Sequence, residues 1–309
     1  MPSWNDLLEE FSSTPDPQKS QWIEDRRAEF FGGVSRHQGG RNVIFYGAAF
    51  LQKQAPAPMV SITHEDINGF MSVIYGMDWS KGLTLLLHTP GGNPNAAQTI
   101  VEYLRSKFAS VEVIVPALAM SAGTMISLAS DKITMGRQSQ LGPIDPQLTV
   151  GGRTMSARGV VDQFTRASAE ILKNPAAAHV WAPITQSLGP ALLADAQAAL
   201  DYSETMVAEW LSRWMFSGDA DAVAKGKAVA KHFNDASTHK SHGRRIDLAE
   251  AVAQGLTVEK LEDDQPLQEL VLSVYHLMTI LFEHSPATKL IMGSNGHNWM
   301  KNLAPGEAA

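Results

Sequence analysis

The amino-acid sequence predicts an α/β protein built around a parallel β-sheet that helices cover on both faces. Two successive units of apolar strand, turn and helix carry this prediction, one beginning at Leu83 and the other at Val111. Continuous apolar strands that alternate with helices are typical of parallel sheets buried on both sides. The composition, 44% hydrophobic and 18% charged over 309 residues, supplies enough apolar surface for one large core.

Helical patterns flank this predicted core at both ends of the chain. Residues 1–40 carry apolar positions at helical spacing and are expected to form a helical N-terminal arm. The β-branched and aromatic run NVIFY then predicts the first strand of the main domain, which we expect to span residues 41–262. Residues 263–309 are expected to form a helical C-terminal extension.

The composition excludes several classes of chemistry. The chain contains no cysteine, so disulfides, cysteine-ligated metals and a thiol nucleophile are excluded, and a covalent nucleophile has to be an oxygen or a nitrogen. The net charge of −7 offers no overall attraction to nucleic acid or anionic lipid. The sequence has no phosphate-binding or dinucleotide-binding glycine motif and no metal-ligand pattern, so we expect no cofactor and no metal.

No segment is expected to be a targeting peptide or a membrane span. The first residues, MPSWNDLLEEF, are acidic and polar, whereas a secretory peptide has a basic start and an apolar run. The longest apolar tract, residues 113–129, is β-branched in its first part and is then interrupted by Ser121, Gly123 and Thr124. This pattern predicts a buried strand, a turn and a buried helix, and we expect the protein to be cytoplasmic.

Two turns at consecutive strand ends carry the residues best suited to chemistry. The first, HTPGG at 88–92, leads into a helix, and its adjacent glycines can turn N–H groups outward as an oxyanion hole. The second places Ser121 at the start of a helix, where free N–H groups favour developing negative charge. Taken singly, either turn is usually structural. Together they are expected to meet at the carboxyl edge of the sheet, where α/β proteins usually build their sites.

Three motifs, in this order, resemble the serine dehydrogenase proteinase family, a branch of the Clp-like protease and signal peptide peptidase superfamily that shares the crotonase fold. The motifs are HTPGG at 88–92, PALAMSAGTMISLASDKITMGRQSQLGPIDPQ at 116–147 and SHGRRIDLAEAVAQGL at 241–256. The resemblance implies a ClpP/crotonase-like spiral of ββα units with extra helical N- and C-terminal segments. It also implies homo-oligomeric assembly and peptide-bond hydrolysis by a nucleophilic serine.

The resemblance assigns roles to individual residues of this chain. Ser121 matches the nucleophile of the superfamily. Gly91 and Gly92 match the glycines of the oxyanion loop, and the N–H of Ala122 matches the second oxyanion donor. The position that holds the histidine in Clp-type proteases falls near Ile144, so the sequence departs from the superfamily pattern at the general base.

The group that would take the proton of Ser121 is therefore left open. His242, in the SHGRRI segment, would act with Asp145 as its orienting acid. Lys173 stands at a spacing from Ser121 similar to the serine–lysine spacing of some bacterial signal peptide peptidases, and His239 is a third candidate. A site without a competent base is a further alternative. Asp145, between two prolines, fits a purely structural turn as well as it fits catalysis.

These observations predict a serine endopeptidase that acts on a peptide or protein substrate and forms a homo-oligomer. An unfoldase or adaptor is a possible partner that the sequence does not identify. Two other classes stay in view. The missing Clp-type histidine favours a catalytically silent oligomeric scaffold or adaptor of the same fold. In a crotonase-like enzyme, the same two N–H donors would polarise an acyl thioester, although that chemistry gives a serine at position 121 no necessary role.

Overall fold

The chain folds into two units in a computed structural model that describes residues 3–189 and 191–303. The first unit contains residues 1–141 and 246–309, and the second contains residues 142–245. This division differs from the three segments expected from the sequence. The reason is that the helices at both ends of the chain pack into the same core as the sheet.

The first unit is built on a seven-stranded sheet with the order β11-β10-β1-β2-β3-β5-β9. Strands β1, β2, β3, β5 and β9 run parallel to one another. Strand β10 is antiparallel to β1, and β11 is antiparallel to β10. A separate parallel pair joins β4 to β6. The strands are β1 (Asn42–Ala48), β2 (Leu83–His88), β3 (Val111–Val115), β4 (Leu118–Ala119), β5 (Lys132–Met135), β6 (Gln140–Leu141), β9 (Val258–Lys260), β10 (Ala287–Gly293) and β11 (Asn298–Asn302). The α/β class predicted from the sequence is confirmed.

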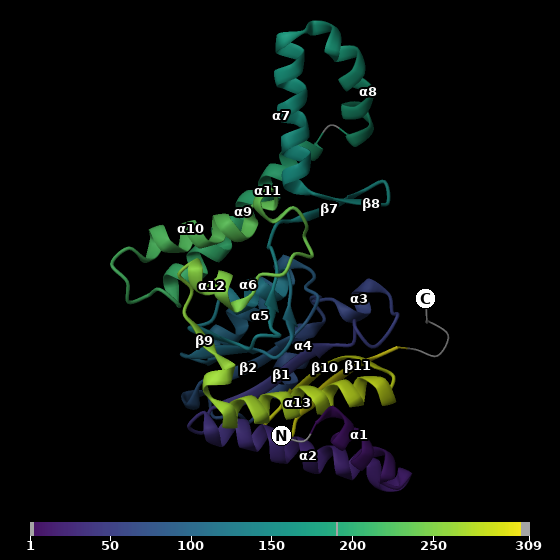
Figure 1. The fold of residues 1–309 in the computed structure, drawn as a ribbon, viewed down its shortest axis with the longest axis vertical. Helices are drawn as coiled ribbons and strands as arrows, with labels where there is room; N and C mark the ends of the chain where they lie inside the picture. Colours follow the sequence, from purple (N-terminus) through teal and green to yellow (C-terminus); the bar gives the residue numbers. More distant parts are fainter. Residues whose placement is uncertain (1–2, 190, 304–309) are drawn as a thin grey trace. The chain divides into compact units, whose positions relative to one another are not determined.

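Helices cover both faces of this sheet. On one face, α2 and α13 lie side by side (Figure 1), and Phe31 of α2 and Val271 of α13 share a buried cluster with Phe45 of β1. On the other face, the ring of Phe70 in α4 meets the ring of Tyr46 with 5.3 Å between centroids. The helices of this unit are α1 (Trp4–Ser13), α2 (Asp16–His37), α3 (Ala57–Val60), α4 (Asp66–Ile74), α5 (Pro94–Lys107), α6 (Ala122–Leu128), α12 (Leu248–Ala253) and α13 (Gln265–His284), with short 3-10 turns at Trp79–Lys81 and Leu261–Asp263.

The C-terminal segment is only partly the helical extension expected from the sequence. Helix α13 matches the expectation, but β10 and β11 follow it and join the sheet beside β1. All residues of β10 are buried, so its sequence ATKLIMG lacks the alternation that marks a strand with one exposed face. A short apolar run of this kind cannot be told from a buried helical segment by periodicity alone.

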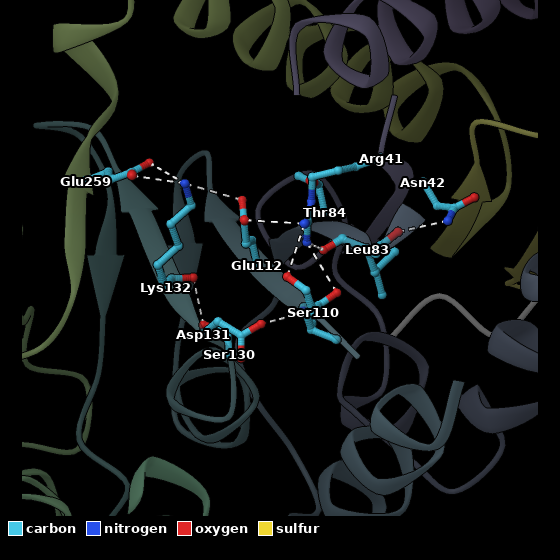
Figure 2. A network of polar contacts seen from close by, with 12 residues as sticks. Arg41, Asn42, Leu83, Thr84, Ser110, Glu112, Ser130, Asp131, Lys132 and Glu259 are labelled. Atoms are coloured by element: carbon cyan, nitrogen blue, oxygen red, sulfur yellow. Dashed lines mark hydrogen bonds and ion pairs between the residues drawn. The ribbon is translucent and has the colours of Figure 1, made fainter. Parts of the chain in front are cut away.

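A polar network ties together the amino ends of the parallel strands, at the edge opposite the predicted site (Figure 2). The guanidinium of Arg41 donates to Leu83 O (2.7 Å) and to the hydroxyl of Ser110 (3.1 Å). It also pairs with Glu112, whose carboxylate is shared with Lys132. Because these residues belong to four neighbouring strand ends, the network fixes the strands relative to one another and leaves the carboxyl edge free for chemistry.

The second unit is mostly helical. A β-hairpin of β7 (Gln147–Val150) and β8 (Arg153–Ser156) precedes its helices. The helices are α7 (Ala157–Lys173), α8 (Ala178–Leu188), α9 (Leu192–Arg213), α10 (Ala222–Asn234) and α11 (Ala236–His239), with a 3-10 turn at Pro175–Ala177. Within the described residues of both units, no helix is both long and apolar enough to cross a bilayer.

Candidate active site

Ser121 occupies a sharp turn between strand β4 and helix α6 in the first unit. Its backbone has φ 50° and ψ −115°, in the left-handed region that residues other than glycine rarely enter. Such a conformation costs on the order of 1–3 kcal/mol and persists only where the surrounding structure enforces it. Strain of this kind concentrates at functional sites, and a strained strand-to-helix turn is one way to expose a nucleophilic serine.

Two other serines of the chain show what an ordinary helix cap looks like. Ser3 and Ser156 each precede a helix and have an extended backbone conformation. Their hydroxyls accept hydrogen bonds from Asp6 N–H and Gly159 N–H, respectively. Ser121 holds the same place before α6, but its side chain makes no capping hydrogen bond. A capping role therefore does not account for this serine.

Gly91 brings the glycine turn into direct contact with the serine turn. Its φ of 99° suits glycine, and a methyl group added to it would lie 2.6 Å from Met120 O and 2.7 Å from Ser121 Cβ. Real Cβ atoms do not approach other atoms so closely. The two turns that the sequence placed at one sheet edge thus touch, and only a residue without a side chain fits at position 91.

Thr89, which the sequence reasoning did not single out, holds the two turns together. Its N–H donates to Leu118 O (2.9 Å), and its carbonyl accepts from Met120 N–H (3.0 Å). Its buried hydroxyl accepts from Gly91 N–H (3.1 Å), and its methyl group contacts Gly123 of α6. Nothing in the local sequence marks this residue, because its partners Leu118 and Met120 come from a different strand end.

Two backbone N–H groups at this junction are available to a ligand. Gly91 N–H is occupied by Thr89, so it is a poor donor for a substrate. In the described residues, Gly92 N–H donates to no other group. Ala122 is the first residue of α6, and its N–H has no acceptor within the helix. Of the two loop glycines, Gly92 is therefore the better oxyanion donor, with Ala122 N–H as its proposed partner.

Replacing Gly91 by alanine is expected to destabilise the first unit strongly. The new methyl group would meet the serine turn, and the backbone would be held at a positive φ, so we expect a loss of about 3 kcal/mol in the free energy of unfolding. Gly76 is a matched control, because its φ of 78° is also positive but nothing lies within 4 Å of the added methyl group. Gly76→Ala should cost about 1 kcal/mol. Equal losses for the two variants in urea unfolding would show that the contact at Gly91 is not tight.

His88 ends strand β2 and is fully buried beneath the glycine turn. Its Nδ1 accepts a hydrogen bond from Leu118 N–H (3.4 Å), and its ring packs between Phe50 and Tyr275 with centroids about 5 Å away. Nε2 has no hydrogen-bond partner among the described residues. Burial lowers the pKa of His88 to about 4, so the imidazole is neutral in the folded protein near pH 7.

This burial predicts acid sensitivity. The unfolded chain binds a proton at His88 below about pH 6.5, whereas the folded chain does not until about pH 4. The stability that the neutral His88 contributes is therefore complete above pH 6.5 and is lost as the pH falls toward 4, by about 3 kcal/mol. Urea unfolding of the parent and of His88→Gln at pH 7 and pH 4 measures this loss. The free energy of unfolding of His88→Gln should depend less on pH than that of the parent. His64→Gln changes an exposed histidine, so its free energy of unfolding should depend on pH as strongly as that of the parent. An equally steep dependence in His88→Gln would refute the assignment.

In the second unit, His242 and Asp145 form a hydrogen-bonded pair. Nδ1 of His242 lies 2.8 Å from Oδ1 of Asp145, and the aspartate side chain is buried. The other carboxylate oxygen accepts from the side-chain amide of Gln147 at 2.7 Å. A carboxylate on Nδ1 favours the tautomer with its proton there, which leaves Nε2 as a proton acceptor. This is the arrangement that a histidine base requires.

The other two candidate bases lie in less suitable surroundings. Lys173 is exposed at the end of α7, whereas lysine bases work from desolvated sites. His239 is buried, with Nε2 2.7 Å from His232 O and Nδ1 2.7 Å from a guanidinium nitrogen of Arg244. Both of its ring nitrogens are engaged, so it has no nitrogen left for a serine proton.

Residues 58–176 match the sequence model of a family described as ClpP-like SDH-type serine proteinase. The matched segment contains both turns, Asp145 and Lys173, but not His242. The resemblance found in the sequence motifs is confirmed over this segment. The fold class is thus α/β around a large central sheet, and the segment 58–176 is ClpP-like.

Curated relatives cover a smaller part of the chain. Two uncharacterized proteins of Methanocaldococcus jannaschii, MJ0137 and MJ1495, are 46% and 38% identical to it over 87 residues. Each alignment spans 28% of this chain and 30% of the relative, so less than a third of either relative is covered. Among solved structures, a mutant of the 1510-N membrane-bound stomatin-specific protease aligns at 19% identity and a TM-score of 0.40, over 68% of this chain and 79% of that one.

Proposed function

We propose that this chain, whose residues 58–176 match the ClpP-like SDH-type serine proteinases, is a serine endopeptidase with Ser121 as its nucleophile. The observation that carries the proposal is the backbone of Ser121, which is held in a strained conformation while its side chain caps no helix. A serine kept in place for folding alone would gain nothing from this strain.

The proposed reaction is acyl transfer. Ser121 Oγ attacks the scissile carbonyl and its proton passes to the general base, which later returns it to the leaving amine. The tetrahedral oxyanion accepts hydrogen bonds from Gly92 N–H and Ala122 N–H. Water then hydrolyses the acyl-enzyme by the same route, and Ser121 is restored.

We assign the base to His242 and its orientation to Asp145. Support comes from within the second unit, where Asp145 holds Nδ1 of the imidazole. The structural alternative for Asp145 was a turn held by backbone N–H groups. Its carboxylate instead accepts from the side chains of His242 and Gln147, and from no backbone N–H in the described part of the chain. Lys173 is the alternative base, and its exposed position argues against it.

The substrate is proposed to be a peptide or protein, and the assembly a homo-oligomer in the cytoplasm, with an unfoldase or adaptor as an open partner class. The substrate class and the assembly rest on the family match over 58–176. A silent scaffold and a thioester enzyme remain the alternatives, but neither gives a strained Ser121 a role.

The direct test offers a mixture of unstructured peptides to the purified full chain and identifies new termini by mass spectrometry. We expect cleavage by the parent and none by Ser121→Ala. Ser127→Ala is the matched control, because Ser127 lies in the same helix with its hydroxyl bonded to Gly123 O, and this variant should cleave normally. Cleavage that survives in Ser121→Ala would overturn the proposal, and absence of cleavage by folded parent would favour the scaffold.

A further inference from the structure

A buried ion pair links strand β10 to helix α4 in the first unit. Lys289 Nζ lies 2.5 Å from Asp66 Oδ1, and the two side chains are 1% and 0% exposed. Removing both charges from water is costly, so such a pair persists only with further hydrogen bonds around it. Tyr46 supplies one of these, since its hydroxyl donates to Asp66 Oδ2 at 2.6 Å.

The remaining partners of this pair all belong to the short segment 61–63. Lys289 Nζ donates to Ser61 O (3.0 Å) and to Thr63 Oγ1 (3.1 Å). Asp66 Oδ2 accepts from Thr63 N–H (2.9 Å). The lysine and the aspartate thus hold the segment on both sides of Ile62.

Ile62 in turn holds the glycine turn. Its N–H donates to Gly91 O (2.8 Å), and its carbonyl accepts from Asn93 N–H (3.0 Å). The approach is close, since a methyl group on Gly92 would come within 2.4 Å of the Ile62 backbone. The position of the glycine turn on this side is therefore set by segment 61–63.

The geometry of one peptide bond connects this contact to the proposed oxyanion hole. Gly91 O and Gly92 N–H belong to the same peptide unit, which is trans and planar. The two groups of a trans peptide point in opposite directions. Because Gly91 O is directed at Ile62, Gly92 N–H is directed away from it, and it donates to no described group on that other side.

We propose that Lys289 and Asp66 are positioning residues for the oxyanion donor Gly92 N–H, acting through Ser61–Thr63; for catalysis this rests on the proposed function. Neither residue touches the substrate. Their pair fixes segment 61–63, Ile62 orients the Gly91–Gly92 peptide, and that peptide aims the donor. Loss of one oxyanion-hole donor costs on the order of 10²–10³ in kcat, so misplacing it should cost about 10- to 100-fold.

The test uses the double variant Lys289→Met/Asp66→Asn, which removes both charges together and avoids an unpaired buried charge. The new asparagine oxygen can still accept from Tyr46 and Thr63. We expect a folded protein whose kcat for a peptide substrate falls about 10- to 100-fold while KM changes little. Affinity for a peptide aldehyde, which forms a tetrahedral adduct with the serine, should fall in parallel.

Lys53→Met is the matched control. Lys53 also anchors the start of β10, with Nζ donating to Ser285 O (2.5 Å) and Ala287 O (2.6 Å), but it does not contact segment 61–63. This variant is expected to keep its kcat even where its stability falls as much as that of the double variant. An equal drop in kcat for both would mean that the effect is loss of stability, and would overturn the proposal.

Amide hydrogen exchange separates this inference from the proposed function. In the folded double variant, exchange at Ile62 N–H and Asn93 N–H should accelerate about tenfold or more, whereas Lys53→Met should leave it unchanged. Unchanged exchange at both amides would overturn the proposal, whether or not the parent cleaves peptides. If the double variant does not fold, Thr63→Val can be used instead, because it removes one hydrogen-bond acceptor of Lys289 at a half-buried position. Exchange at Ile62 N–H and Asn93 N–H should accelerate in this variant too, by a smaller factor.

Discussion

Replacing Ser121 by alanine is expected to lower kcat for peptide hydrolysis by about 10⁴-fold or more. The hydroxyl is the atom that forms the acyl-enzyme, so no neighbouring group can take over its role. The oxyanion donors are backbone groups and are unchanged by the substitution. Substrate affinity should therefore be close to that of the parent.

The same variant should fold normally, because the Ser121 side chain caps no helix. Urea unfolding of the parent and of Ser121→Ala should give free energies within about 1 kcal/mol of each other. A large loss of stability would mean that the hydroxyl has a structural role after all, and residual activity within about tenfold of the parent would exclude it as the nucleophile.

His242→Gln and Asp145→Asn are expected to produce the next largest losses, each about 10³- to 10⁴-fold in kcat. Glutamine cannot accept the serine proton, and an asparagine beside Nδ1 no longer fixes the required tautomer or stabilises the imidazolium. The two losses should not add, because the aspartate acts only through the histidine. The double variant should therefore be about as slow as His242→Gln alone.

Lys173→Met provides the contrast. This lysine is exposed, and its replacement should leave kcat within about twofold of the parent. A variant set in which Lys173→Met is inactive and His242→Gln is active would reverse the assignment of the base. Stopped assays at several pH values would exclude a simple shift of the pH optimum as the cause.

The sequence was sufficient for the local parts of the site. The HTPGG turn follows β2 and the SAGT turn follows the short strand β4, and strand polarity alone predicts that the two turns lie on the same side. The structure adds the contact of Gly91 with Ser121 and shows that Thr89 occupies Gly91 N–H, which favours Gly92 as the donor. That choice depends on backbone direction within a turn, and a residue pattern does not determine it.

The parts that the sequence missed depend on partners far apart in the chain. Lys289 and Asp66 are separated by 223 positions, and nothing near Lys289 indicates a buried charge. Strand β10 carries this lysine, and its uniformly buried sequence was mistaken for part of a helical extension. Once the strand is assigned to the sheet beside β1, the lysine lies next to α4 and its role in holding segment 61–63 can be inferred.

The central claim, that Ser121 is an activated nucleophile, is tested most directly by mapping the adduct of a fluorophosphonate probe on the folded full chain. The account predicts a single adduct, located by peptide mass spectrometry on Ser121, which disappears in His242→Gln and persists in Ser127→Ala. Absence of an adduct on folded protein across the pH range, or an adduct on another serine, would contradict it.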